Sequence, residues 1–254
     1  MGDIEAELWI PPDVSDIISA GNTGLFGLLA DGTVLKFPRN KNYPYNIEHI
    51  ECEACILSAL GKHPRITKYL GKEKYGLRFE RAVYGDVRSY MTSVPSKNIS
   101  TQLRLKWSIQ GAEALAFIHS QGVIHCDLNP NNFLLYDALD LRLCDFSESM
   151  YGDLEAKVME SIRYFLPREE CSTPTVQTDL FAFGSVVYYF MTGHEPYESL
   201  SEDQVTAQFS REIFPNVDTI LGGSVILGCW KKRFKNADQV FQALTKLGKV
   251  LPPC

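Results

Sequence analysis

Residues 180–191 make the strongest demand on the fold, because this run is apolar on nearly every face of a helix. A helix without a polar face has to be packed on all sides, so it belongs in the interior of a helical lobe. Gly184 and Ser185 interrupt the run, and it is shorter than the roughly 18 residues that cross a bilayer. We therefore expect a large helical lobe and no membrane span.

The chain before this run supplies further pieces of such a lobe. Residues 103–120 carry an amphipathic stripe, which predicts a helix packed along one face. Between the two helices, residues 123–146 combine short β-like pieces, at 133–135 and 141–143, with dense polar residues. Polar residues on loops between short strands are a frequent place for chemistry, so functional residues are expected in this segment.

The first 82 residues have a different pattern, of strands with one helix. Residues 14–37 read as strands with turns, and Asp31-Gly32 is a hairpin signal. Apolar residues recur at the helical period over residues 47–60. The sequence thus predicts a small β-rich part followed by a larger helical part. Two further β-like runs complete the small part, at residues 66–70 and 76–82.

Composition excludes several classes of protein. Of the 254 residues, 45% are hydrophobic and 22% are charged, which rules out a disordered or fibrous chain. The net charge of −6, from 25 basic and 31 acidic residues, disfavours a protein that wraps nucleic acid. The odd number of cysteines, 7, does not indicate a disulfide framework. Because the N-terminus also lacks an apolar signal core, we expect an intracellular, cytoplasmic protein.

Four polar or glycine-containing features follow one another along the chain. Each has an ordinary reading by itself, since Gly-x-x-Gly is usually a turn, a strand lysine usually faces solvent and a loop aspartate is usually a helix cap. Their joint order over the whole chain is what chance does not explain. The features are Ser19 to Phe26, Val34-Leu35-Lys36 with Glu53 after it, His125-Cys126-Asp127-Leu128-Asn129-Pro130-Asn131-Asn132, and Cys144-Asp145-Phe146-Ser147.

This order and spacing resemble the protein kinase family, whose signature is a glycine-rich loop, a strand lysine, a His-Arg-Asp loop and an Asp-Phe-Gly loop. The resemblance covers about residues 14–250, and its details are similar to a group of small, divergent kinase-like proteins of filamentous fungi. It implies an α+β, two-lobed fold in a single domain of residues 1–254. The small antiparallel β-rich N-lobe with one helix would take residues 1–82, and the larger, mainly α C-lobe residues 83–254.

The resemblance implies the residues of an active site, position by position. Lys36 would contact the α- and β-phosphates of ATP, and Glu53 would pair with Lys36. Asp127 would accept or orient the proton of the attacking hydroxyl. Asn132 and Asp145 are the implied ligands of Mg²⁺, a cation that prefers oxygen ligands.

An ATP pocket is implied as well. Gly21 and Gly24 would let backbone N–H groups approach the phosphates. Phe79 would be the gatekeeper, and adenine would lie between the lobes against the backbone of Glu80 and Ala82. Together, the implied ATP-binding residues are Gly21, Gly24, Phe26, Lys36, Phe79, Glu80 and Ala82.

Several positions depart from the family pattern. Ser19 stands at the first loop glycine, Cys126 replaces the arginine before the catalytic aspartate, and Ser147 replaces the glycine after Asp-Phe. Arg168 stands where the family has a glutamate that pairs with a C-lobe arginine, here Arg233. Those two arginines would repel each other unless Glu169 or Glu170 moved in.

The departure with the largest chemical consequence is Asn129. Serine/threonine kinases have a lysine at this position that contacts the γ-phosphate, and tyrosine kinases have an arginine two residues later, where this chain has Asn131. Neither cation is present. By analogy with the loss of one oxyanion donor, the missing contact costs about 2.7–4 kcal/mol, or about 10² to 10³ in rate.

Three functions remain open at this point. The first is an ATP-dependent protein kinase, of serine/threonine type, that transfers the γ-phosphate of MgATP to a protein hydroxyl. The alternative is a pseudokinase that binds nucleotide or partners with little phosphotransfer, and the third is a small-molecule kinase of related fold. Neither the protein substrate nor the oligomeric state can be read from the sequence. Ser149, Tyr151 and Ser161 are conceivable phosphorylation sites in the expected activation segment, residues 148–162.

Overall fold

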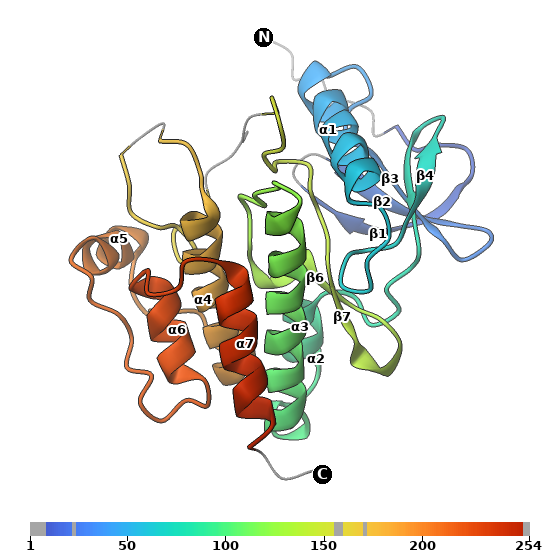
Figure 1. Ribbon diagram of the computed structural model, residues 1–254. Helices are drawn as coiled ribbons and strands as arrows, with labels where there is room; N and C mark the ends of the chain where they lie inside the picture. Colours follow the sequence, from blue (N-terminus) through green and yellow to red (C-terminus); the bar gives the residue numbers. More distant parts are fainter. Residues whose placement is uncertain (1–8, 22–23, 155–159, 170–171, 251–254) are drawn as a thin grey trace. The chain divides into compact units, whose positions relative to one another are not determined.

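The computed structural model describes residues 9–21, 24–154, 160–169 and 172–250, and it divides into two compact units (Figure 1). One unit is an antiparallel sheet with a helix, and the other is mainly helical, which confirms the predicted α+β, two-lobed class. The predicted single domain, with parts at residues 1–82 and 83–254, stays a prediction. The first unit holds the described residues of Met1–His63, Thr67–Arg81 and Asp145–Ser147, and the second holds those of Pro64–Ile66, Ala82–Cys144 and Glu148–Cys254.

The sheet of the first unit places Lys36 on its middle strand. Neighbouring strands are antiparallel throughout, and Lys36 pairs with Phe26 on one side and Leu77 on the other. The hairpin expected at Asp31-Gly32 is present, with Gly32 at a φ of 83° that glycine tolerates well. In sheet order the strands are β1 (Val14–Ala20), β2 (Gly24–Leu29), β3 (Val34–Pro38), β5 (Gly76–Phe79) and β4 (Tyr69–Glu73).

Two strand predictions were displaced. The run at 66–70 joins the sheet only from Tyr69 onward, and the strand continues to Glu73. The prediction ended too early because β4 is an edge strand, and the residues Lys72 and Glu73 at its end do not continue the apolar pattern. Ile66 is instead buried in the second unit, where it forms a single parallel bridge with Leu143. The run at 76–82 ends as a strand at Phe79.

Helix α1 (Pro44–Leu60) begins earlier than the predicted residue 47. Pro44 suits the first helical turn, because the backbone N–H that proline lacks has no helical partner there. The helix ends at Gly61, whose φ is 64°. The buried face of α1 includes Glu53, a carboxylate that has to be paired at such a position.

In the second unit, helix α4 (Val176–Thr192) contains the apolar run and is almost entirely buried, as expected. It begins with a capping box at Thr175, ends at the left-handed Gly193, and packs against α3 (Thr101–Ser120) and α6 (Gly223–Trp230). A Cβ atom at Gly184 would lie 2.8 Å from Cβ of Cys229, so glycine permits the close approach of α4 and α6. The remaining elements are α2 (Val87–Ser93), β6 (Phe133–Leu135), β7 (Leu141–Leu143), α5 (Glu202–Ser210) and α7 (Ala237–Gly248) (Figure 1).

Strands β6 and β7 lie where the two short β-like pieces were expected, and they pair with each other as a short antiparallel hairpin. The turn Pro130–Asn132 leads directly into β6. In the order of the chain, residues 125–132 therefore lie between α3 and this hairpin. Among the described residues, none of the helices has the length and apolar character needed to cross a membrane.

Candidate active site

Lys36 of β3 is a buried cation in the first unit, with only 2% of its surface exposed. Its neighbours along the strand, Leu35 and Phe37, belong to the core of the sheet. An ammonium group removed from water is stable only when it is paired. The environment of Lys36 therefore requires acidic partners.

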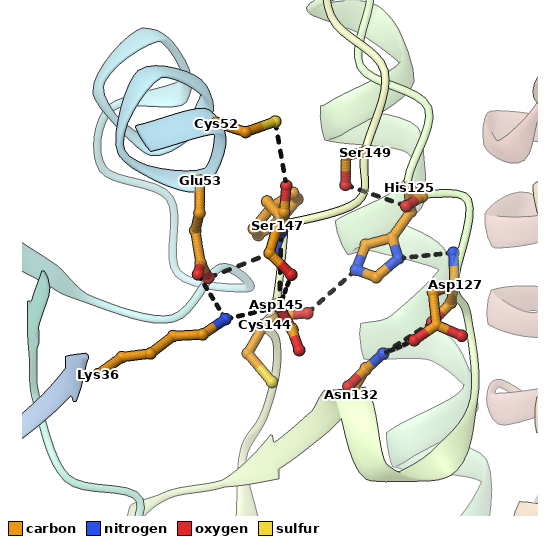
Figure 2. Close-up of polar contacts among 11 residues, drawn as sticks. Lys36, Cys52, Glu53, His125, Asp127, Asn132, Cys144, Asp145, Ser147 and Ser149 are labelled. Carbon is orange, nitrogen blue, oxygen red and sulfur yellow. Dashed lines mark hydrogen bonds and ion pairs between the residues drawn. The ribbon is translucent and has the colours of Figure 1, made fainter. Parts of the chain in front are cut away.

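Two carboxylates supply this pairing (Figure 2). The Nζ atom of Lys36 lies 2.6 Å from Oε2 of Glu53 and 2.7 Å from Oδ1 of Asp145. Burial alone would lower the pKa of Lys36, but the charges of Asp145 and Glu53 raise it above its ordinary value. Burial also raises the pKa of Glu53, with Lys36 acting in the opposite direction. The cluster thus holds a protonated Lys36 against two acidic groups.

The Asp145–Ser147 segment is attached to the helix that carries Glu53. The backbone N–H of Phe146 donates to Oε1 of Glu53 at 3.3 Å, and the thiol of Cys52 lies 4.0 Å from the carbonyl oxygen of Phe146. Asp145 has a φ of 63°, an uncommon conformation for a residue other than glycine. The surrounding contacts therefore have to stabilise this uncommon backbone conformation, from which the carboxylate of Asp145 reaches Lys36.

The expected phosphate loop is described at both of its ends, while Asn22 and Thr23 lie outside the described residues. The N–H of Gly21 donates to the carbonyl oxygen of Gly24 at 2.8 Å, so these two described residues are in direct contact. A Cβ atom at Gly24 would lie 3.4 Å from Cε of Lys36, so glycine keeps the backbone close to the lysine stem. The ring of Phe26 lies 5.4 Å from Nζ of Lys36.

The residues implied for adenine are divided between the units. Phe79 ends β5 and is buried, and the N–H of Glu80 donates to the carbonyl oxygen of Lys68 at 3.0 Å. Ala82 belongs to the second unit, where its carbonyl oxygen accepts from the N–H of Gly85 at 3.2 Å.

In the second unit, Asp127 accepts hydrogen bonds from two amide side chains, of which Figure 2 shows that of Asn132. Nδ2 of Asn132 donates to the backbone oxygen of Asp127 at 2.7 Å and to its Oδ2 at 2.9 Å. Nδ2 of Asn129 lies 3.1 Å from Oδ1. Both carboxylate oxygens of Asp127 thus accept hydrogen bonds from the loop that follows it.

His125 orients the backbone before Asp127. Its Nε2 lies 3.0 Å from the carbonyl oxygen of Cys144, and because a carbonyl only accepts, Nε2 carries the proton. Nδ1 then accepts from the N–H of Asp127 at 3.4 Å. The histidine therefore ties the Asp127 loop to the end of β7.

Asp179 of α4 anchors this loop from inside the helical core. Its carboxylate accepts the backbone N–H groups of His125 at 2.8 Å and Cys126 at 3.0 Å, and it lies 2.8 Å from Nε2 of His119. Burial would raise the pKa of Asp179, but the hydrogen bonds and the neighbouring histidines hold it below its ordinary value. A charged Asp179 thus stabilises the left-handed Cys126, whose φ is 68°.

The sequence placed Asp179 only at the start of a helix, so its role as an anchor was missed. A signal was available, because an acidic residue in the first turn of an otherwise apolar helix needs buried partners. His119, which is one of these buried partners of Asp179, was missed with it.

Arg168 has an acidic partner that was not expected from the sequence. Arg168 pairs with Glu160, at 2.7 Å between Nη2 and Oε2, and its guanidinium lies 4.4 Å from the ring centre of Phe165. The carboxylate of Glu160 is buried, so the pair satisfies a charge that could not stay unpartnered. Arg233 and Glu169 are exposed, and Glu170 lies outside the described residues.

The residues implied for a metal have suitable chemistry. Asn132 uses its amide nitrogen on Asp127, which leaves its oxygen at the opposite end of the amide, and Asp145 supplies a carboxylate. These are the hard oxygen donors that Mg²⁺ prefers. Within the described ranges, no group of three or more His, Cys, Asp or Glu side chains is placed so that it could hold a metal ion.

Comparisons with known proteins agree with this geometry. A family model described as "Protein kinase domain" matches residues 33–251. The chain is 25% identical over 251 residues to a probable LIM domain-containing serine/threonine-protein kinase of Dictyostelium discoideum, covering 92% of this chain and 38% of the relative. It is 28% identical over 233 residues to serine/threonine-protein kinase D of Synechocystis, covering 83% and 45%.

A human relative, receptor-interacting serine/threonine-protein kinase 1, is 27% identical over 222 residues, covering 76% of this chain and 32% of the relative. The chain thus spans less than half the length of each of these three relatives. The similarity to fungal kinase-like proteins stays a prediction.

Proposed function

The chain belongs to the protein kinase family, and from this premise we propose that it is a serine/threonine-type kinase that transfers the γ-phosphate of MgATP to a protein hydroxyl. Protein kinase domains in general use ATP and a divalent metal and act on proteins. The observation that carries the proposal is the buried cluster of Lys36, Glu53 and Asp145, because this energetically costly arrangement matches what phosphoryl transfer needs.

We assign to Lys36 the neutralisation of phosphate charge. Glu53 holds the ammonium group at a fixed place, so Lys36 does not have to reorganise when nucleotide binds. Asp145 and Asn132 are the proposed ligands of the divalent metal. A bound metal supplies further neutralisation of the phosphate oxygens, whose charge resists the approach of a nucleophile.

Asp127 is the proposed base. It accepts the proton of the substrate hydroxyl as that oxygen bonds to the γ-phosphorus and the bond to the leaving ADP oxygen breaks. Hydrogen bonds from Asn129 and Asn132 fix its carboxylate, so the base is oriented before substrate arrives. Asp179 supports this orientation through the backbone of residues 125 and 126.

The test is transfer of radiolabelled γ-phosphate from ATP, with Mg²⁺, to the protein itself and to generic protein substrates. We expect label with the wild-type chain and a loss of about 10³-fold or more in Asp127→Ala. Equal labelling of the two proteins would overturn the assignment of Asp127.

The alternative is a pseudokinase, and the observation that favours it is Asn129. This residue donates to Asp127 and provides no cation for the γ-phosphate. Thermal unfolding separates the two functions. A stabilisation by MgATP that Lys36→Ala abolishes, in a protein that transfers no label, would establish the pseudokinase. If MgATP gave no stabilisation and the protein transferred no label, the proposal of a nucleotide site would be overturned.

A further inference from the structure

Ser147 makes a contact that the family's usual glycine cannot make. Its hydroxyl donates to Oδ1 of Asp145 at 2.7 Å, and its backbone N–H lies 3.4 Å from the same oxygen. Nζ of Lys36 lies 2.7 Å from that oxygen as well. One carboxylate oxygen of Asp145 is therefore held by three donors, two of which come from Ser147 (Figure 2).

The conformation of Asp145 makes this restraint consequential. Asp145 is left-handed, with a φ of 63°, whereas Ser147 is not among the left-handed residues of the described chain. A left-handed aspartate persists only where surrounding contacts hold it. The backbone at position 147 does not itself demand glycine, so a side chain with a hydroxyl is accommodated there.

Burial strengthens the contact. Ser147 is 3% exposed, while the side chain of Asp145 is 30% exposed. A hydrogen bond to a carboxylate is stronger where water is excluded from the donor. The two oxygens of a carboxylate share one plane, so holding Oδ1 from a buried hydroxyl also sets the direction of Oδ2.

We propose that Ser147 is a positioning residue that fixes the carboxylate plane of Asp145 for binding a divalent metal with nucleotide. The inference rests on the proposed function of Asp145 as a metal ligand. Partners that hydrogen-bond a metal ligand typically change metal affinity by about 10- to 100-fold when they are removed. Ser147 acts through Asp145 and does not itself contact the metal or the substrate.

The experiment measures Mn²⁺ binding by electron paramagnetic resonance in the presence of a non-hydrolysable ATP analogue. We expect Ser147→Ala and Ser147→Gly each to need about 10- to 100-fold more Mn²⁺ for half-saturation. Affinity for the nucleotide alone should change less than about threefold, because Ser147 donates to Asp145 and not to the nucleotide. Ser108→Ala is the matched control, since this buried serine donates to the backbone oxygen of Arg104 within α3.

The outcomes separate this inference from the proposed function. Wild-type Mn²⁺ affinity in both Ser147 variants would overturn the positioning role and leave the proposed function intact. Failure of the wild-type protein itself to bind Mn²⁺ with the analogue would overturn both. An equal loss in Ser108→Ala would mean that any missing buried hydroxyl has this effect, which also contradicts a specific role for Ser147.

Discussion

At the scale of single residues, the arrangement is dominated by charges that are buried and paired. Lys36 is 2% exposed and Glu53 1%, and their stability depends on the contact between them. Removing one member of such a pair leaves the other as an uncompensated buried charge, which costs far more than the pair contributes when intact. This asymmetry gives a direct prediction.

Lys36→Met is expected to lower the free energy of unfolding by about 3–5 kcal/mol and to abolish phosphotransfer. Chemical denaturation provides the measurement. Lys72→Met is the matched control in the same sheet, because Lys72 pairs with Glu51 at 2.6 Å but both side chains are 52% exposed. Its loss should stay below about 1 kcal/mol. Equal losses in the two variants would contradict the buried-pair account.

Asn129 gives a second prediction at this scale. Asn129→Lys should raise the initial rate of transfer, by up to about 10²-fold, because it restores a cation for the γ-phosphate. The same change should cost about 1 kcal/mol of stability, since Oδ1 of Asn129 accepts the N–H of Asn131 at the start of a short helical turn. A variant with an unchanged or lower rate, at wild-type ATP affinity, would refute the account of the missing cation.

Motif order named the candidate site residues and the pairing of Glu53 with Lys36, but not the other contacts that these residues make. The spacing of Lys36, Glu53, Asp127 and Asp145 marked these residues as the candidate acidic and basic groups of the site. The contact between Ser147 and Asp145 and the pair of Arg168 with Glu160 could not be predicted. Each depends on the direction of one side chain in a loop, for which no hydrophobic periodicity gives a signal.

At the scale of elements, helix α4 forms part of the helical core and also carries Asp179, which binds the backbone of the loop before Asp127. Its apolar faces could be predicted from residues 180–191, because full burial leaves a continuous apolar signal. The edge strand β4 could not, because an exposed edge is built from charged and polar residues. Asp179 in the first turn of α4 connects the helical core to the loop of Asp127.

Asp179 also gives a pH prediction. Its pKa is lower in the folded chain than the ordinary value of 3.8, so its contribution to stability is present above that value and is lost as the pH falls. Asp179→Asn should therefore cost about 3 kcal/mol near pH 7 and less near pH 3. Urea denaturation of both proteins at the two pH values measures this. A difference that grows on acidification would reverse the assigned sign.

At the scale of the whole molecule, the net charge of −6 does not indicate how charges are arranged at the candidate active site. The functional groups are placed one by one against local partners, such as Lys36 between two carboxylates and Asp127 between two amides. Lys36, Glu53 and Asp145 lie in the first unit, and Asp127 and Asn132 lie in the second. The central claim is the proposed metal-dependent phosphotransfer, which is expected to depend on Asp145 and on Asp127.

The initial rate of γ-phosphate transfer to a generic protein substrate tests this claim most directly, measured for the wild-type chain, Asp145→Ala and Asp127→Ala. The expected result is Mg²⁺-dependent transfer by the wild-type chain and a loss of about 10³-fold or more in each variant. Asp218→Ala, at an exposed residue of the second unit, is the control and should keep the wild-type rate. Transfer that survives either active-site change at the wild-type rate would contradict the account.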